Sequence, residues 1–120
     1  MNYRIEYRED ASLSHAEDEE LRRLLLACFP HEPLFRERRY LRERPPHRWL
    51  VRGEGIIAHC AVHEKTLGSG AGDIRVGGVA EVCVDAAHRR KGLVREMLDA
   101  VHSWLAENGT PFAVQVQVKV

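Results

Sequence analysis

The chain carries no net charge, because 18 lysines and arginines are balanced by 18 aspartates and glutamates. A protein that binds nucleic acid through its overall field needs an excess of positive charge, so any basic site here has to be local. No apolar run approaches the roughly 20 residues that span a bilayer, and the N-terminal MNYRIEYRED is not a signal peptide. We therefore expect a cytoplasmic protein that binds neither nucleic acid nor membrane.

Cysteine is scarce, and the three cysteines, Cys28, Cys60 and Cys83, lack the C-x-x-C spacing of a zinc site. Such a scattered set is typical of reduced core thiols, and we expect no bound metal. The sequence also lacks the G-x-x-x-x-G-K-[ST] phosphate loop and the G-x-G-x-x-G motif, which disfavours the common nucleotide-binding folds. With 44% hydrophobic and 30% charged residues over 120 positions, the composition indicates one globular domain, 1–120.

Hydrophobic periodicity divides the chain into strands and helices. The capping-box pattern Ser14-x-x-Glu17 starts a helix, and four apolar residues at helical spacing give it a buried face: Leu21, Leu24, Leu25 and Cys28. The predicted elements are a strand over 2–8, a helix between Ser14 and Pro30, a short helix over 33–44, strands over 48–52, 56–67 and 73–84, a helix between Gly92 and Asn108, and a last strand over 112–120.

This order, β-α-α-β-β-β-α-β, constrains the topology. The final strand, helix and strand form a crossover, which places strands 79–84 and 112–118 side by side and parallel. The three middle strands, joined by short glycine-containing turns, form an antiparallel meander. The predicted fold class is therefore α/β (α+β), with a mixed, mostly antiparallel sheet flanked by helices on both faces.

Residues 79–98, VAEVCVDAAHRRKGLVREML, are the most informative stretch. An apolar strand runs into a polar turn, and the basic corner Arg89-Arg90-Lys91-Gly92 opens directly into the last helix. The first amides of a helix lack intrahelical partners and lie at the positive end of its dipole, so they attract anions. A phosphate or pyrophosphate is the expected guest, and a solvated turn before a helix is the alternative.

Motif and element order together resemble the GNAT superfamily of acyl-CoA-dependent N-acyltransferases. The run VDAAHRRKGLV, 84–94, is similar to the family's Q/R-x-x-G-x-G/A motif. The stretches IIAHCAVHEKTL and GGVAEVCV are similar to bacterial members such as aminoglycoside 2′-N-acetyltransferases. The resemblance covers nearly the whole chain. It implies acetyl-CoA, or another short acyl-CoA, as co-substrate and a small-molecule or peptide amine as acceptor, without a covalent enzyme intermediate.

The resemblance also implies roles for the strand and the corner. The thioester would lie where strands 79–84 and 112–118 splay apart, and the backbone of the first strand would bond the pantetheine arm through Val82, Cys83 and Val84. Beside the charge of Arg89, the pyrophosphate would be held by the amides of Arg90, Lys91, Gly92, Leu93, Val94 and Arg95. Val94 stands where the family normally has glycine or alanine.

Glu81 lies mid-strand between apolar neighbours, where a carboxylate must be solvated, paired or functional. In acyl transfer the attacking amine must lose a proton, and a carboxylate whose pKa is raised toward neutrality can take it, directly or through water. Glu81 is therefore the candidate catalytic residue, and an exposed or salt-bridged surface residue is the alternative. For Cys83, a buried core thiol is favoured over a nucleophile.

His59 and His63 share one face of their predicted strand, about 13 Å apart, which is too far to share a metal ion. A polar, outward face is the favoured interpretation, and a role in the acceptor site is the alternative.

Beyond the last strand, a full family domain continues with a helix and a strand pair, which often supply a tyrosine acid. Here no tyrosine follows Tyr40, and the given sequence stops at Val120. A partner subunit that completes the fold, a truncated reading frame, or a non-catalytic acyl-CoA-binding module would each account for this. The alternating VQVQVKV leaves a bare strand edge, which tends to pair with another chain. We therefore expect a homodimer with strand 112–120 at or near the interface.

Overall fold

The computed structural model describes residues 3–110, 112–115 and 118–119. Its strands are β1 (Arg4–Glu9), β2 (His47–Gly53), β3 (Gly55–Ser69), β4 (Gly72–Val84), β5 (Phe112–Gln115) and β6 (Val118–Lys119). Its helices are α1 (His15–Cys28) and α2 (Leu93–Glu107), with short 3-10 turns η1 (Asp10–Ser12), η2 (Pro33–Arg36) and η3 (Ala86–His88). The predicted positions 2, 116–117 and 120 lie outside the described residues. Neither α1 nor α2 has the length and apolar character that crossing a bilayer requires.

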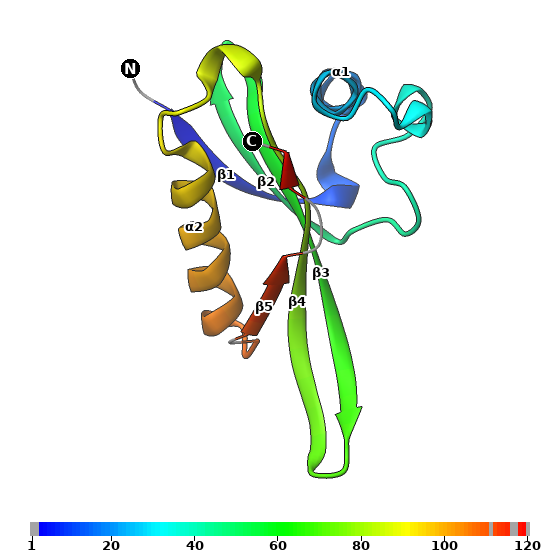
Figure 1. Cartoon of the computed structure of the whole chain (residues 1–120), viewed down its shortest axis with the longest axis vertical. Coiled ribbons are helices and arrows are strands. Elements are labelled where there is room, and N and C mark those ends of the chain that lie inside the picture. Colours follow the sequence, from blue (N-terminus) through cyan, green and yellow to red (C-terminus); the bar gives the residue numbers. More distant parts are fainter. Residues whose placement is uncertain (1–2, 111, 116–117, 120) are drawn as a thin grey trace.

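The strands form one mixed sheet in the order β1-β2-β3-β4-β5, with β6 also paired to β4. The pairs β1–β2, β2–β3 and β3–β4 are antiparallel, whereas β5 and β6 run parallel to β4. The predicted meander and parallel crossover are therefore confirmed. The β3–β4 hairpin extends well beyond the rest of the molecule (Figure 1).

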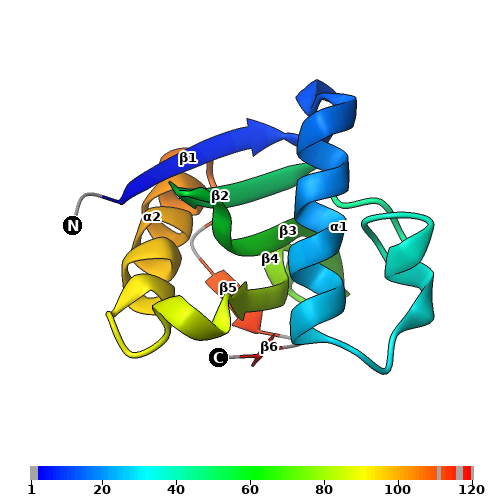
Figure 2. The same ribbon diagram turned by 90° about the horizontal axis from the view of Figure 1, so that it is seen from above.

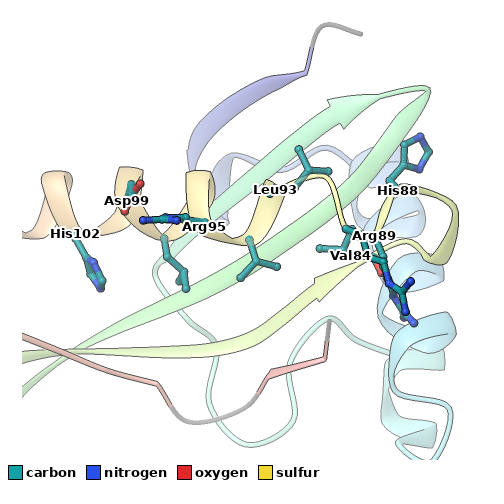
Figure 3. A pocket seen from close by; sticks show the side chains of 11 residues that line it. Val84, His88, Arg89, Leu93, Arg95, Asp99 and His102 are labelled. Carbon is teal, nitrogen blue, oxygen red and sulfur yellow. Dashed lines mark hydrogen bonds between the residues drawn. The ribbon is translucent and has the colours of Figure 1, made fainter.

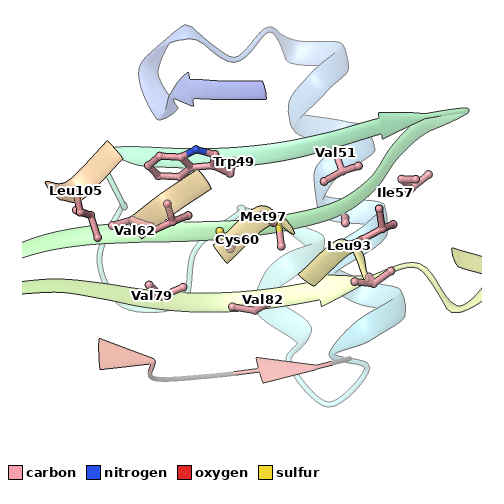
Figure 4. Packing of buried hydrophobic residues seen from close by; sticks show 13 residues of the cluster. Trp49, Val51, Ile57, Cys60, Val62, Val79, Val82, Leu93, Met97 and Leu105 are labelled. Carbon is pink, nitrogen blue, oxygen red and sulfur yellow. The ribbon is translucent and has the colours of Figure 1, made fainter. Parts of the chain in front are cut away.

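The two helices lie on opposite faces of the sheet (Figures 1 and 2). The face under α2 carries one apolar cluster, in which Trp49, Val62 and Val79 pack near Met97 and Leu105 (Figure 4). The face under α1 carries a second cluster, which comprises Leu21, Leu24, Leu25, Cys28, Phe29, Phe35, Leu50, Ile56 and Cys83. The stripe of α1 was predicted from spacing, and each helix packs on its own side of the sheet.

The start of α1 is fixed by the predicted capping box. The hydroxyl of Ser14 accepts from the Glu17 amide at 3.1 Å, and the Glu17 carboxylate accepts from the Ser14 amide at 2.9 Å. Hydrogen bonds from Arg8, the Ser14 amide and Arg52 lower the pKa of Glu17 to about 2. This pairing ties α1 to β1 and β2, and so sets how the helix crosses the sheet.

The predicted second helix, 33–44, is wrong beyond η2. Arginine side chains donate hydrogen bonds to backbone carbonyls of this segment that would otherwise accept from helix amides. Arg22 donates to the carbonyl of Arg36 at 2.5 Å, and Arg48 donates to the carbonyl of Arg39 at 2.8 Å. Arg39 itself reaches away to Asp10. Arg39 thus pairs with a buried carboxylate distant in the chain, and the segment runs beside α1 as an irregular loop.

Candidate functional site

The corner before α2 has the backbone geometry of an open anion cradle. Gly92 is the residue before the helix, at φ 75°, and no side chain caps the first turn. Arg90 is also left-handed, at φ 64°. A Cβ added at Gly92 would meet no atom within 4 Å, so the space in front of these amides is open. Unpaired first-turn amides beside such a space can receive an anion.

A pocket of about 800 Å³ lies in front of this corner, between α2 and the end of β4 (Figure 3). Seven of the predicted cofactor-binding residues line it: Val84, Arg89, Arg90, Gly92, Leu93, Val94 and Arg95. The sequence prediction missed further lining residues, namely His88 and, along α2, Leu98, Asp99 and His102. The last three follow Val94 and Arg95 at helical spacing, which is the signal that could have found them.

The basic side chains of the corner do not all face this pocket. Arg89 points toward α1 (Figure 3), and its Nε donates to the carbonyl of Val84 at 3.1 Å. The ammonium of Lys91, which does not line the pocket, lies 6.0 Å from the ring centroid of Tyr3. Arg90 and Arg95 line the pocket without such a tie among the hydrogen bonds of the described residues. They are the better placed positive charges.

The expectation that the two strands splay apart beside Cys83 is wrong for the residues described. Strand β6 pairs with β4 at Val82 and Cys83. It continues the register in which β5 pairs with β4 from Val76 onward. The side chains of Val82 and Cys83 are fully buried, so only their backbone could meet a ligand. Cys83 is a core thiol, as predicted. It lies against Cys28, and hydrogen bonds from Cys83 and, to a smaller extent, from Arg89 lower the pKa of Cys28.

Strand β4 carries a bulge at Glu81. The pairing of β3 with β4 shifts register between His59 and Ala61, and Glu81 takes up the extra residue at φ 55°. A positive φ is uncommon for a residue with a side chain, and bulges of this kind redirect side chains next to functional sites. The bulge leaves Glu81 only 6% exposed, so the alternative of a surface residue is wrong.

The Glu81 carboxylate is buried, and few hydrogen bonds or opposite charges offset the loss of its hydration. Its Oε2 atom has no hydrogen-bond partner among the described residues, and the nearest cation, Nη1 of Arg48, lies 3.9 Å away. Burial therefore raises the pKa of Glu81 to about 7, against the opposing charge of Arg48. A carboxylate with this pKa exchanges a proton readily near neutral pH, which is what a general base requires.

Glu81 adjoins a buried polar cluster formed by Asp10, Arg39, Arg48 and His59. The prediction of an outward-facing His59 is wrong, because its partner in register is Leu50, whose side chain lies in the core under α1. His59 is fully buried, and its Nε2 lies 3.0 Å from Nη1 of Arg48. Since a guanidinium only donates, Nε2 accepts, and the proton on Nδ1 faces the Glu81 carbonyl at 3.2 Å. Burial holds the pKa of His59 well below its ordinary value.

A second pocket of about 670 Å³ lies on the face of the sheet that carries α1. Glu81 and His63 both line it. This cavity is consistent with the alternative interpretation, in which His63 belongs to the acceptor site. The other lining residues are Glu32, Leu41, Arg42, Glu43, Lys65, Leu67, Val76, Gly78 and Ala80. In the part of the chain described, no group of three or more His, Cys, Asp or Glu side chains is placed to hold a metal ion.

Comparison with known proteins gives one family. A family model described as an acetyltransferase (GNAT) domain matches residues 11–118. A search of curated proteins found no match.

Several solved structures share the fold. A ribosomal-protein-alanine N-acetyltransferase from Brucella melitensis biovar Abortus 2308 is 19% identical, with a TM-score of 0.72 over 99% of this chain and 82% of that one. An aminoglycoside acetyltransferase from an uncultured soil metagenomic sample, in complex with sisomicin, is 17% identical, with a TM-score of 0.70 over 95% and 76%. A predicted acetyltransferase from Clostridium acetobutylicum, with acetyl-CoA, is 16% identical, with a TM-score of 0.69 over 94% and 80%.

Proposed function

Because the chain belongs to the GNAT family of acetyltransferase domains, we propose that it is an N-acetyltransferase that moves an acyl group from acetyl-CoA, or another short acyl-CoA, to a primary amine. The acceptor attacks the thioester directly, and no enzyme-bound acyl intermediate forms. The single observation that carries the proposal is the uncapped start of α2, which opens onto a pocket of about 800 Å³.

The donor fits this pocket in charge and in polarity. The first-turn amides of α2 and the nearby Arg90 and Arg95 supply the positive field that a pyrophosphate needs. The remaining lining includes Val84, Leu93, Val94 and Leu98, an apolar strip suited to the pantetheine arm. Val94 is only half-buried in the core under α2, so its branched side chain can turn toward the ligand.

Binding of the thioester to the β4 backbone requires β6 to leave. Val82 and Cys83 are the residues that the resemblance assigns to the pantetheine arm, and β6 pairs with both. Among the described residues β6 spans Val118–Lys119 and pairs with β4 at two positions, so few backbone hydrogen bonds have to break there. We propose that the acyl-CoA takes the position of β6 and that the freed β4 amides then stabilise the oxyanion.

Glu81 acts as the general base, on the face of the sheet opposite to α2 and the donor pocket. In the proposed reaction its carboxylate takes one proton from the ammonium form of the acceptor, directly or through a water molecule. The free amine forms the new C–N bond as the C–S bond breaks, and coenzyme A leaves as the thiolate. The nitrogen then gives up its second proton, which ends on the departing thiolate, so the products are the amide and the free thiol of coenzyme A. The second pocket, with Glu81 at its wall, is the acceptor site. The aminoglycoside acetyltransferases among the structural neighbours support a small-molecule amine, and the ribosomal-protein-alanine N-acetyltransferase supports a peptide amine.

The test is release of free thiol from acetyl-CoA in the presence of a panel of amines, which includes aminoglycosides, polyamines and peptides. We expect amine-dependent thiol release in the wild-type protein. We expect Glu81→Gln to lower kcat by roughly a hundredfold or more, the usual contribution of a general base. Unchanged turnover in Glu81→Gln would remove Glu81 from the mechanism.

A second candidate function, a non-catalytic acyl-CoA-binding module, is favoured by one observation, the occupied edge of β4 at Val82 and Cys83. Calorimetry with coenzyme A separates the two functions. Binding of coenzyme A without thiol release against any amine of the panel would establish the module. Absence of binding would contradict both.

A further inference from the structure

Arg48 on β2 is the largest fully buried side chain in the described part of the protein. A buried guanidinium is costly unless each of its nitrogens finds a partner. Here Nε donates to Asp10 at 2.6 Å, Nη2 donates to the carbonyl of Arg39 at 2.8 Å, and Nη1 donates to His59 at 3.0 Å. The orientation of the side chain is therefore fixed on three sides.

The partners of Arg48 are themselves immobilised. Asp10 accepts a fork of two hydrogen bonds from Arg39, at 2.7 and 2.9 Å, and Arg39 also reaches Asp18 on α1 at 2.7 Å. Asp10 is 1% exposed, and hydrogen bonds from Arg39 and Arg48 outweigh its burial and lower its pKa. The guanidinium of Arg48 is thus anchored from η1, from α1 and from the loop before β2.

Arg48 interacts with Glu81 in two ways, directly and through His59. Its Nη1 lies 3.9 Å from Oε2 of the Glu81 carboxylate and is the closest cation to that oxygen among the described residues. The same Nη1 also donates to His59, whose other ring nitrogen faces the Glu81 carbonyl at 3.2 Å. One route acts on the charge of the carboxylate, and the other acts on the backbone of the bulge at φ 55°.

We propose that Arg48 is a positioning residue for acyl transfer, which holds the Glu81 carboxylate at the wall of the acceptor pocket and keeps it in the anionic form that can take a proton. This inference rests on the proposed function. It assigns no contact between Arg48 and substrate, because Arg48 is fully buried and does not line either pocket.

Other titratable groups also lie near Glu81. Within the cluster these are Asp10, whose charge opposes Arg48, and the neutral His59. On β4 itself the neighbour is the Cys83 thiol, whose pKa is raised well above its ordinary value. The pocket side contributes Glu32, Arg42, Glu43, His63 and Lys65. Lys65 lies 3.8 Å from Glu43, and both are exposed, so they offset each other in water. Arg48 remains the dominant cation.

The direct test is a titration of the Glu81 side-chain carboxyl by carbon-13 NMR, with the signal identified by its loss in Glu81→Gln. We expect Arg48→Gln to move the Glu81 midpoint upward by roughly one pH unit, because an opposite charge within about 4–6 Å is removed. Arg48→Lys keeps the charge and should leave the midpoint near the wild-type value. Arg52→Gln is the matched control, since Arg52 lies on the same strand but binds Glu6 and Glu17.

Kinetics test the positioning itself. Arg48→Lys should lower kcat at least tenfold with little change in KM for the amine, because the shorter, unforked side chain no longer fixes the bulge. The same substitution should cost little in a Glu81→Gln background, since the group that it positions is gone. An equal loss in both backgrounds would show a merely structural role and overturn the proposal, and this measurement decides even if Arg48→Gln does not fold.

The two proposals fail in different ways. If Glu81→Gln keeps full activity while the Glu81 midpoint still moves in Arg48→Gln, the base assignment in the proposed function is wrong, although the electrostatic coupling exists. If the midpoint of Glu81 is the same in wild type, Arg48→Gln and Arg52→Gln, the role of Arg48 is overturned whatever the activity.

Discussion

Gly92 and Gly109 flank α2 with nearly the same left-handed backbone, at φ 75° and 78°. A Cβ built at either residue meets no atom within 4 Å. An alanine at either position therefore suffers backbone strain without a clash, at a cost of about 1–2 kcal/mol. The two glycines differ in what lies in front of them, because only Gly92 faces the pocket at the start of α2.

This pair gives a matched test of the donor site. We expect Gly92→Ala and Gly109→Ala to lower the free energy of unfolding by similar amounts. Only Gly92→Ala should weaken coenzyme A binding, by roughly tenfold to a hundredfold, because the added methyl group keeps the pyrophosphate from the first-turn amides. Calorimetry and urea unfolding on both variants measure the two effects. Equal affinities in the two variants would contradict a pyrophosphate site at this corner.

The raised pKa of Glu81 predicts a pH dependence of stability. Its pKa is about 7 in the folded protein, against an ordinary value of 4.5. Between these values the folded protein holds a proton that the unfolded chain has released, so stability falls as pH rises from about 4.5 to about 7. The difference in pKa corresponds to roughly 3 kcal/mol.

The variant Glu81→Gln has no carboxyl at this position, so it should lose less stability than the wild type over the same interval. We expect the difference between the two proteins, measured by urea unfolding at pH 5 and at pH 8, to grow in favour of the variant. All other ionisable groups are common to both proteins, so their contributions cancel in the difference. A difference that stays constant with pH would contradict a raised pKa for Glu81.

Local signals in the sequence were sufficient for α1, for α2 and for the basic corner. The capping box of Ser14 and Glu17 and the apolar stripe of α2 are set by residues close in the chain, and the structure keeps both. The start of α2 at Gly92 follows for the same reason, since turn and helix lie within one short segment. Seven of the predicted cofactor-binding residues accordingly line one pocket.

The buried polar cluster could not be predicted in the same way. The strand pattern predicts an outward face for His59, and nothing local in the sequence marks Arg48 as buried. Both are fully buried in the structure, where Asp10 and the loop before β2 bind Arg48. The alternation of a strand fixes which residues share a face, but not whether that face is covered. The same contacts explain why 33–44 is not a helix, since Arg39 binds Asp10 and Asp18, which are distant in the chain.

The position of β5 at the edge of the sheet leads us to expect self-association. Strand β5 closes the order at one end, with β4 as its partner among the described strands. An edge strand offers unpaired amides and carbonyls to another chain. We expect light scattering at micromolar concentration to give a mass near twice the 13.7 kDa of one chain. A monomer mass across the concentration series would contradict the homodimer.

The pairing of β6 with β4 predicts a change in hydrogen exchange when the donor binds. Val82 and Cys83 lie opposite Val118 and Lys119, so a thioester that bonds the β4 backbone must displace β6. We expect saturating coenzyme A thioester to speed amide exchange at Lys119 while the amides of β4 stay protected. Gly92→Ala, which weakens the pyrophosphate contact, should reduce this change at the same ligand concentration. Unchanged exchange at Lys119 in a protein saturated with the thioester would place the pantetheine arm elsewhere in the pocket. The two results thus decide whether the catalytic amides of β4 are free or must first be uncovered.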